Sequence, residues 1–107
     1  MNIEFIEVDV FTKQILAILT DDEYSQLQSS LNQKPERGVL IPGGRGLRKL
    51  RWATGAKGKR GGARIIYYLQ LSESIIYLVY AFKKTEKTDL SPKQLSALAQ
   101  YVRELVL

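Results

Sequence analysis

The residues that could do chemistry are concentrated in one basic, glycine-rich stretch that runs from Arg37 to Arg64. This stretch contains nine lysines and arginines, no aspartate or glutamate, and all eight glycines of the chain. Because the whole chain of 107 residues has a net charge of +5, the residues outside the stretch together carry −4. Positive charge concentrated in this way indicates an anionic partner, and the phosphates of a nucleic acid are the partner that we expect.

The composition removes most of the familiar catalytic groups. The chain contains no histidine and no cysteine, which excludes an imidazole base, a cysteine nucleophile, a disulfide and the usual zinc ligands. We therefore expect no metal and no cofactor. The stretch also lacks the GxxxxGK[ST] pattern of a nucleotide-binding loop, which disfavours an enzyme that acts on small nucleotides. Lysine, arginine and carboxylate side chains remain for the chemistry.

The segment LRKLRWA is predicted to be a strand with a cationic face. Alternation along a strand places Lys49 and Arg51 on one face and Arg48 and Trp52 on the other. Two cations two positions apart are about 6 to 7 Å apart, which is close to the repeat of a nucleic-acid backbone, so they could hold consecutive phosphates. Trp52 is the aromatic residue best suited to base stacking. The alternative is that these charges only protect an exposed strand edge from pairing.

The loop ATGAKGKRGGAR follows this strand and combines glycines with cations. Glycine allows backbone N–H groups to approach an anion, so we interpret Lys57, Lys59 and Arg60 as parts of the same anion site. The alternative is a hairpin tip whose charge is incidental. Arg64 differs from these residues because it opens the next strand, where a sheet would hold its planar guanidinium in a position suited to clamping a phosphate.

A second basic segment, FKKTEKTDL, follows the last predicted strand. Lys83, Lys84 and Lys87 could form another wall of the anion site, and Glu86 is the carboxylate that could take or hold a proton there. Alternatively, the acidic residues of this segment serve the N-terminus of the following helix. We favour the second interpretation for Asp89, because either Asp89 or Ser91 can cap a helix that begins at Pro92, and we leave the role of Glu86 open.

The elements around these residues predict an α+β fold. Branched and aromatic residues predict strands, helical spacing predicts helices, and the prolines and glycines of 34–46 predict a loop. The expected elements are a strand at 2–8, a helix at 11–19, a helix that starts with a capping box at Thr20 and Glu23 and is bounded by Pro35, strands at 47–53, 63–71 and 75–82, and a helix from Pro92. The order βααβββα indicates a single domain over 1–107, with helices packed on a mostly antiparallel sheet.

The sequence also bears on where the protein works. The longest apolar runs fall well short of the roughly 20 residues that cross a bilayer. The acidic opening MNIEFIEVDV lacks the basic and apolar regions of a signal peptide. We therefore expect a cytoplasmic protein with no membrane partner.

Two phrases of the sequence resemble one protein family. The phrases GGRGLRKLRWATGAKGKRGGARIIYYL and YAFKKTEKTDLS, together with the order of elements, are similar to the RelE/HigB superfamily of toxins from type II toxin–antitoxin systems, and in particular to its HigB-like branch. The resemblance spans nearly the whole chain. It implies a RelE-like microbial RNase fold and an mRNA interferase that enters the ribosomal A site, cuts the messenger and inhibits translation. It also implies a cognate antitoxin, and operator DNA as a ligand of the toxin–antitoxin complex.

The resemblance carries site residues with it. The family's lysine pair on the second strand matches Lys49 and Arg51, and its strand-opening arginine in the third strand matches Arg64. The segment KKTEKTDLS departs from the family pattern of an arginine and a late tyrosine, and the histidines of other HigB members are missing, so the proton-transfer groups stay open. The candidates for proton transfer are Lys57, Lys59, Lys84 and Glu86. The further residues expected to contact RNA are Arg45, Arg48, Trp52, Arg60, Lys83 and Lys87.

The expected reaction is metal-independent RNA cleavage. The ribose 2′-hydroxyl attacks the neighbouring phosphate and leaves a cyclic phosphate, so the protein has to align these groups, neutralise the phosphate and move protons. Arg64 would hold the phosphate oxygens, with Lys49 and Arg51 in support, and a lysine crowded by other cations loses its proton more readily. The competing interpretation is a non-catalytic RNA- or ribosome-binding domain with the same basic patch.

Overall fold

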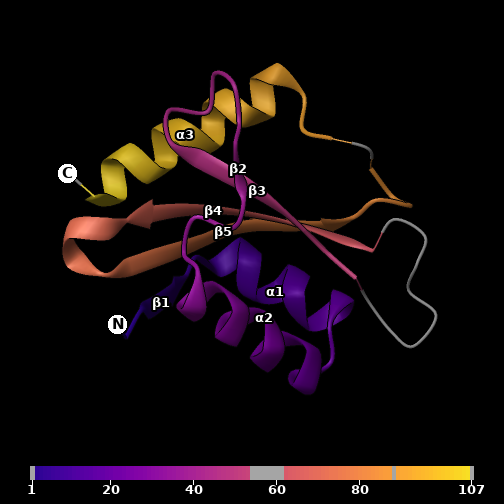
Figure 1. The fold of residues 1–107 in the computed structure, drawn as a ribbon. Coiled ribbons are helices and arrows are strands. Elements are labelled where there is room, and N and C mark those ends of the chain that lie inside the picture. The colour runs from indigo at the N-terminus through magenta and orange to yellow at the C-terminus, as the bar shows by residue number, and fades with distance from the viewer. Residues whose placement is uncertain (1, 54–61, 88, 107) are drawn as a thin grey trace.

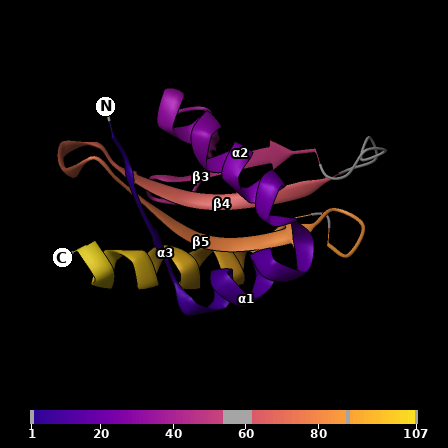
Figure 2. The same ribbon diagram turned by 90° about the horizontal axis from the view of Figure 1, so that it is seen from below.

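The computed structural model describes residues 2–53, 62–87 and 89–106, and it contains a five-stranded sheet with helices on both faces (Figure 1). The elements in chain order are β1 (Glu4–Glu7), α1 (Asp9–Ile18), α2 (Asp21–Gln33), β2 (Val39–Leu40), β3 (Leu47–Trp52), β4 (Ala63–Gln70), the short 3-10 helix η1 (Leu71–Glu73), β5 (Ile75–Lys83) and α3 (Pro92–Val106). The strand order is β1-β5-β4-β3-β2. β1 is parallel to β5 and the other neighbours are antiparallel, and Figure 2 shows β3, β4 and β5 side by side along the sheet.

This architecture confirms the predicted α+β class and mostly antiparallel sheet, with one correction. The segment 34–46 is predicted as a loop, but Val39 and Leu40 form β2, which pairs with Lys49 and Arg48 at the edge of the sheet. The order βααβββα therefore becomes βααββββα. A strand of two residues is too short to show alternation, and the prolines and glycines around it predict a turn, so the sequence pattern does not reveal it.

Side-chain caps define where two of the helices begin. At the start of α2, Thr20 Oγ1 accepts a hydrogen bond from the Glu23 N–H at 3.1 Å, and Glu23 Oε1 accepts one from the Thr20 N–H at 2.8 Å. This is the predicted capping box. Ser91 and Gln94 form the same reciprocal pair at the start of α3. None of the helices in the described part of the chain is long and apolar enough to span a membrane.

Each face of the sheet has its own apolar core. α1 and α2 cover one face, where Phe11 and Leu27 pack with Ile65 of β4, and α3 covers the other, where Val102 packs with Ile66. Figure 1 shows this division, with α3 on one side of the strands and the other two helices on the opposite side. Because neighbouring residues of β4 enter different cores, this strand is buried on both faces at its first five positions.

A buried tyrosine fixes the segment that leads into β2. The Tyr67 hydroxyl donates a hydrogen bond to the Pro35 carbonyl at 2.7 Å and accepts one from the Gly38 N–H at 2.8 Å. Burial raises the pKa of Tyr67, so the hydroxyl remains a donor at neutral pH. A Cβ on Gly38 would lie 2.7 Å from the Tyr67 ring, so only glycine permits this close approach. The contact brings Val39 into register with Lys49.

Candidate nucleic-acid interface

The strand register brings three predicted site residues to one face of the sheet. Arg51 in β3 lies directly opposite Arg64 in β4, and Lys49 lies opposite Ile66. Opposed residues of antiparallel strands share a face, and Ile66 belongs to the core beneath α3. Lys49, Arg51 and Arg64 therefore lie on the α3 side of the sheet, and we call them the cationic cluster.

The three side chains of the cationic cluster differ in exposure. Arg64 is 5% exposed, the Lys49 side chain is 28% exposed, and Arg51 is exposed. Burial lowers the pKa of Arg64 and the charge of Arg51 lowers it further, whereas the carboxylate of Asp89 acts in the opposite direction. A guanidinium stays protonated at neutral pH, so Arg64 presents a charge whose position is fixed by packing. Two arginine forks on adjacent strands suit the oxygens of one phosphate.

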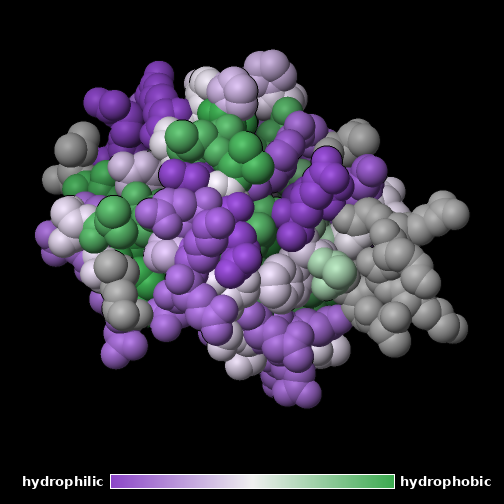
Figure 3. Space-filling view, in the orientation of Figure 1, coloured by the Kyte–Doolittle hydropathy of each residue, from purple (hydrophilic) through white to green (hydrophobic). Residues whose placement is uncertain are grey.

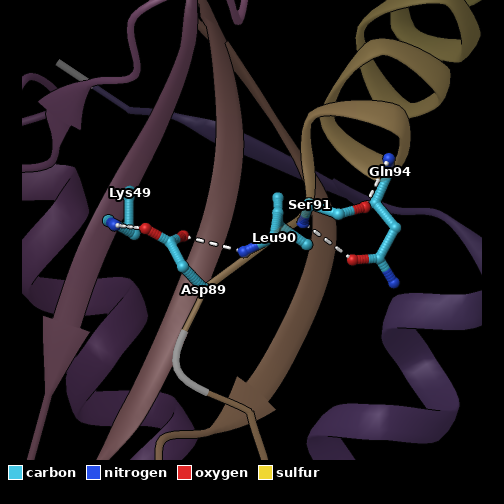
Figure 4. Close-up of polar contacts among 5 residues, drawn as sticks. All are labelled: Lys49, Asp89, Leu90, Ser91 and Gln94. Atoms are coloured by element: carbon cyan, nitrogen blue, oxygen red, sulfur yellow. Dashed lines mark hydrogen bonds and ion pairs between the residues drawn. The ribbon is translucent and has the colours of Figure 1, made fainter.

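Asp89 adds a carboxylate to this arrangement. Its Oδ2 atom lies 2.9 Å from Lys49 Nζ, and its Oδ1 atom accepts a hydrogen bond from the Leu90 N–H at 2.8 Å (Figure 4). The hydrogen bond from Lys49 lowers the pKa of Asp89, and the charge of Arg64 acts in the same direction. Of the two expected caps of α3, Ser91 is confirmed, since its Oγ atom accepts a hydrogen bond from the Gln94 N–H. The expectation that Asp89 serves the N-terminus of α3 is corrected, because the Asp89 carboxylate reaches β3 instead.

A groove of about 510 Å³ opens beside these side chains. Its lining includes Val39 and Ile41, Lys49 and Arg51 of β3, and Asp89. Val39 lies opposite Lys49 in the sheet and is 72% exposed, so an apolar side chain adjoins the cationic cluster. A groove with cations beside an aliphatic surface suits a nucleotide, because the phosphate is charged and the faces of the base are apolar.

The surface of the molecule mixes charged and apolar side chains. Figure 3 shows hydrophilic side chains, in purple, between patches of apolar ones, in green, on the side seen in Figure 1. Both residues of β2, Val39 and Leu40, are among the large apolar residues that remain exposed. Within the described ranges, no three histidine, cysteine, aspartate or glutamate residues are grouped so that they could hold a metal ion. The interface therefore offers cations and apolar contacts to a ligand.

Four other predicted contacts do not face the cationic cluster. Trp52 lies on the opposite face of β3, partly buried against the core beneath α1 and α2, so it is not placed to stack a base beside the cluster. Arg48 is on that face too, where its Nη1 atom donates to the Gly38 carbonyl at 2.8 Å. Lys83 lies directly opposite Ala63, which belongs to the same core, so Lys83 is on that face as well. Arg45 lines a separate pocket beside α3.

The segment after β5 lies at the same end of the sheet as Arg64. The Lys84 N–H donates a hydrogen bond to the Gly62 carbonyl at 3.1 Å, which ties this segment to the start of β4. Glu86 is exposed in the turn after β5. Lys87 Nζ donates a hydrogen bond to Gln94 Oε1, at the start of α3, at 2.8 Å. The backbone of Lys84 is thus joined to the residue that precedes β4, the strand that carries Arg64, and Glu86 lies in the same turn as Lys84. The predicted site residues Lys57, Lys59 and Arg60 lie outside the described residues.

Two residues of the groove are absent from the predicted site. Val39 falls in the segment predicted as a loop, where three apolar residues in a row between glycines and prolines are a weak signal of an edge strand. Asp89 is separated from Lys49 by 40 positions, so no local pattern pairs them. The position of Asp89 beside a basic segment is a weak signal in the sequence for this contact.

These features define an α+β protein whose mixed sheet carries a cationic cluster on the face that it shares with α3. No protein-family model matches the sequence. Among solved structures, the chain is similar to the Escherichia coli toxin RelE, in a structure of an arginine-to-alanine double mutant in the free state, with a TM-score of 0.61 and 12% sequence identity over 95% of this chain and 98% of that one. The chain therefore has a RelE-like fold, and at this identity the likeness shows the fold alone.

Proposed function

We propose that this chain is the toxin of a type II toxin–antitoxin system, from the HigB-like branch of the RelE/HigB superfamily, and that it cleaves messenger RNA on the ribosome. The observation that carries the proposal is the placement of Lys49, Arg51 and Arg64 on one face of a RelE-like sheet, with Arg51 directly opposite Arg64. A phosphate bound there would meet guanidinium groups from two adjacent strands. The similarity to the E. coli toxin RelE supports the assignment to a toxin.

The proposed reaction is metal-independent and uses the RNA as its own nucleophile. The 2′-oxygen forms a bond to phosphorus, the bond from phosphorus to the 5′-oxygen breaks, and the products are a 2′,3′-cyclic phosphate and a 5′-hydroxyl end. Arg64, which packing holds in position, stabilises the charge that grows on the non-bridging oxygens, with Arg51 and Lys49 beside it. Preorganised charge of this kind is commonly the largest single contribution to such a reaction.

Two protons have to move in this reaction, one from the 2′-hydroxyl and one to the 5′-oxygen. The candidates within the described residues are Lys84 and Glu86, on the segment that is tied to the start of β4. Lys57 and Lys59 are the other candidates, and they lie outside the described residues. Lysine and glutamate side chains can each act as the base or the acid in such a proton transfer. A toxin that relies on the ribosome to align its substrate needs only weak acid–base groups of its own.

The proposed partners follow from this role. The toxin would bind messenger RNA in the ribosomal A site, and a cognate antitoxin with negative charge would block the cationic cluster until the toxin is released. The toxin–antitoxin complex would bind operator DNA. An acidic, partly disordered protein encoded beside this gene is the antitoxin that we expect.

Primer extension on a translated messenger tests the nuclease activity. The wild-type protein is expected to create new 5′ ends at ribosome-occupied codons, and Arg64→Ala is expected to reduce them at least about 100-fold while ribosome association is mostly kept. Lys13→Ala is the matched control, because it removes one exposed cation from α1 on the other side of the sheet. A wild-type protein that binds ribosomes but makes no cuts would overturn the nuclease and favour the non-catalytic RNA- or ribosome-binding domain.

A further inference from the structure

The Lys49–Asp89 pair shows that a carboxylate already occupies part of the cationic cluster. One carboxylate oxygen of Asp89 binds Lys49 Nζ at 2.9 Å, and the other is held by the Leu90 N–H at 2.8 Å. Figure 4 shows the two side chains pointing toward each other from β3 and from the segment before α3. The Asp89 carboxylate is thus fixed at both oxygens, with one of them on a cation that the proposed function assigns to RNA phosphate.

The charge of Asp89 reaches beyond its bonded partner. Burial and the charge of Arg51 lower the pKa of Arg64, and the charge of Asp89 offsets part of that lowering, while the charge of Arg64 helps to lower the pKa of Asp89. The carboxylate therefore lies within the electric field of two members of the cationic cluster, Lys49 and Arg64. It also lines the groove that Lys49 and Arg51 line. In charge and position, the carboxylate resembles an anionic ligand of the site.

The Lys49–Asp89 ion pair is strong enough to compete with an RNA phosphate and weak enough for the phosphate to displace it. The Asp89 side chain is 58% exposed, and exposed ion pairs contribute about 0.2 to 1 kcal/mol to stability. A phosphate with several oxygen acceptors and further contacts along the RNA chain can therefore replace the carboxylate on Lys49. An RNA already held on the ribosome does so more easily than free RNA, because its effective concentration at the groove is higher.

We propose that Asp89 is an internal competitor for the phosphate-binding position at Lys49, and that it weakens the binding of free single-stranded RNA to the cationic cluster. This inference rests on the proposed function, because it assumes that RNA phosphate is the ligand of the cationic cluster. RNA has to displace the Asp89 carboxylate from Lys49 before it can occupy the cluster. Removing the negative charge of Asp89 removes this competition.

Binding of a 2′-O-methyl RNA 10-mer, measured by fluorescence anisotropy at low salt, tests the proposal without any cleavage. Asp89→Asn keeps an oxygen for the Leu90 N–H but removes the charge, and it is expected to tighten binding by up to about 5-fold, the upper limit that an exposed ion pair of about 1 kcal/mol implies. Asp22→Asn is the matched control, because it makes the same change at an exposed position of α2, on the opposite side of the sheet, and it is expected to alter binding less than about 1.5-fold.

A double-mutant cycle with Lys49→Gln assigns the effect to the pair. The gain from Asp89→Asn is expected to shrink in the Lys49→Gln protein, because the carboxylate then has no lysine to compete for. An equal gain in both backgrounds, an equal effect of Asp22→Asn, or weaker binding by Asp89→Asn each overturns the proposal. Circular dichroism of every variant shows whether the fold is kept.

Turnover on ribosomes separates this inference from the proposed function. Asp89→Asn is expected to lower KM, whereas loss of a general base lowers kcat about 100-fold or more. A fall of kcat by that amount would make Asp89 a catalytic base and overturn the competitor role. If the wild-type protein cuts no RNA while the binding gain persists, the nuclease fails and the competing carboxylate stands.

Discussion

The two faces of strands β3 and β4 carry different kinds of side chain, mostly apolar toward α1 and α2 and partly cationic toward α3. Toward α1 and α2, every second residue of β4 enters a closed apolar core, and Ala63, Ile65 and Tyr67 are each 0% exposed. Toward α3, the same strands present Arg64 and Arg51 side by side at one end, and an apolar core only at the other. Strand alternation therefore separates the residues that stabilise the fold from those that bind an anion.

This separation has an energetic consequence. The apolar face gains free energy from burial, whereas the cationic face brings like charges together and buries one of them, both of which lower stability. The site depends on the core behind it to hold its cations in place. Substitutions on the two faces are therefore expected to affect different measurements, and the following predictions test that division.

The largest effect is expected from Phe11→Ala, in the core beneath α1. Phe11 is 0% exposed, and truncating a buried phenylalanine costs about 3 to 5 kcal/mol in the free energy of unfolding. Urea denaturation followed by circular dichroism measures the loss. Cleavage per folded molecule is expected to stay within about 2-fold, since the side chain lies behind the sheet. A specific loss of cleavage with little loss of stability would contradict the division between the faces.

The next effect is expected on the opposite face, from Arg64→Lys. Lysine keeps the charge but lacks the planar fork, so kcat on ribosomes is expected to fall about 100- to 1,000-fold, which corresponds to about 3 to 4 kcal/mol of transition-state stabilisation. The unfolding midpoint in urea serves as the control for folding. Activity within 3-fold of the wild type, roughly the scatter of such comparisons, would show that charge alone is sufficient at this position.

The Tyr67→Phe substitution tests the apolar face again, by a smaller change. It removes the hydroxyl that joins the Pro35 carbonyl to the Gly38 N–H, and leaving such buried groups unpaired costs about 1 to 3 kcal/mol. The matched control is Tyr68→Phe, which alters the adjacent residue on the other face of β4. An equal loss of stability in both variants would show that the bridging hydrogen bonds contribute nothing particular.

The pH dependence of stability gives a second measurement on Tyr67. Burial raises the pKa of Tyr67 in the folded state above the ordinary value of about 10. The protonated hydroxyl therefore contributes its full share of the free energy of unfolding below pH 10, and this share is lost as the pH rises from there. Tyr24, whose pKa is raised by burial and by Glu7, acts in the same direction. The fall of the unfolding free energy above pH 10 is therefore expected to be smaller in Tyr67→Phe than in the wild type, without disappearing.

The order of helices and strands could be read from the sequence because each longer element has a local cause. Alternation marks β3 and β4, and a capping box at Thr20 and Glu23 marks the start of α2. The edge strand β2 could not be read in this way, because its pairing with β3 depends on the Tyr67 hydroxyl, which reaches the chain 29 residues before it. Tertiary contacts of this kind leave no local pattern.

Only some residues of the interface can be predicted from the sequence, because the others also depend on tertiary contacts. Alternation places Lys49 with Arg51, but their meeting with Arg64 depends on the register of two strands. A rule based on charge alone also includes Arg48, which the register places on the opposite face. Asp89 becomes part of the site only because the segment before α3 passes over β3. Sequence therefore identifies the types of residue in the site, and the register selects among them.

The smallest effect is expected from Arg51→Thr, which relieves the like-charge pair at the centre of the cationic cluster. Arg51 is exposed and lies directly opposite Arg64, and like charges in such a pair lower stability by about 0.2 to 1 kcal/mol. The free energy of unfolding of Arg51→Thr is therefore expected to rise by that amount at low salt and by less at high salt. Binding of single-stranded RNA is expected to weaken, and the slope of log K against log salt is expected to become less negative by about 0.7, the share of one phosphate contact. Lys13→Thr, on α1, is the control and is expected to leave that slope unchanged. If Arg51→Thr stabilises the fold and weakens RNA binding, the role of Arg51 is ligand binding. A loss of stability on Arg51→Thr would show instead that the cationic face supports the fold.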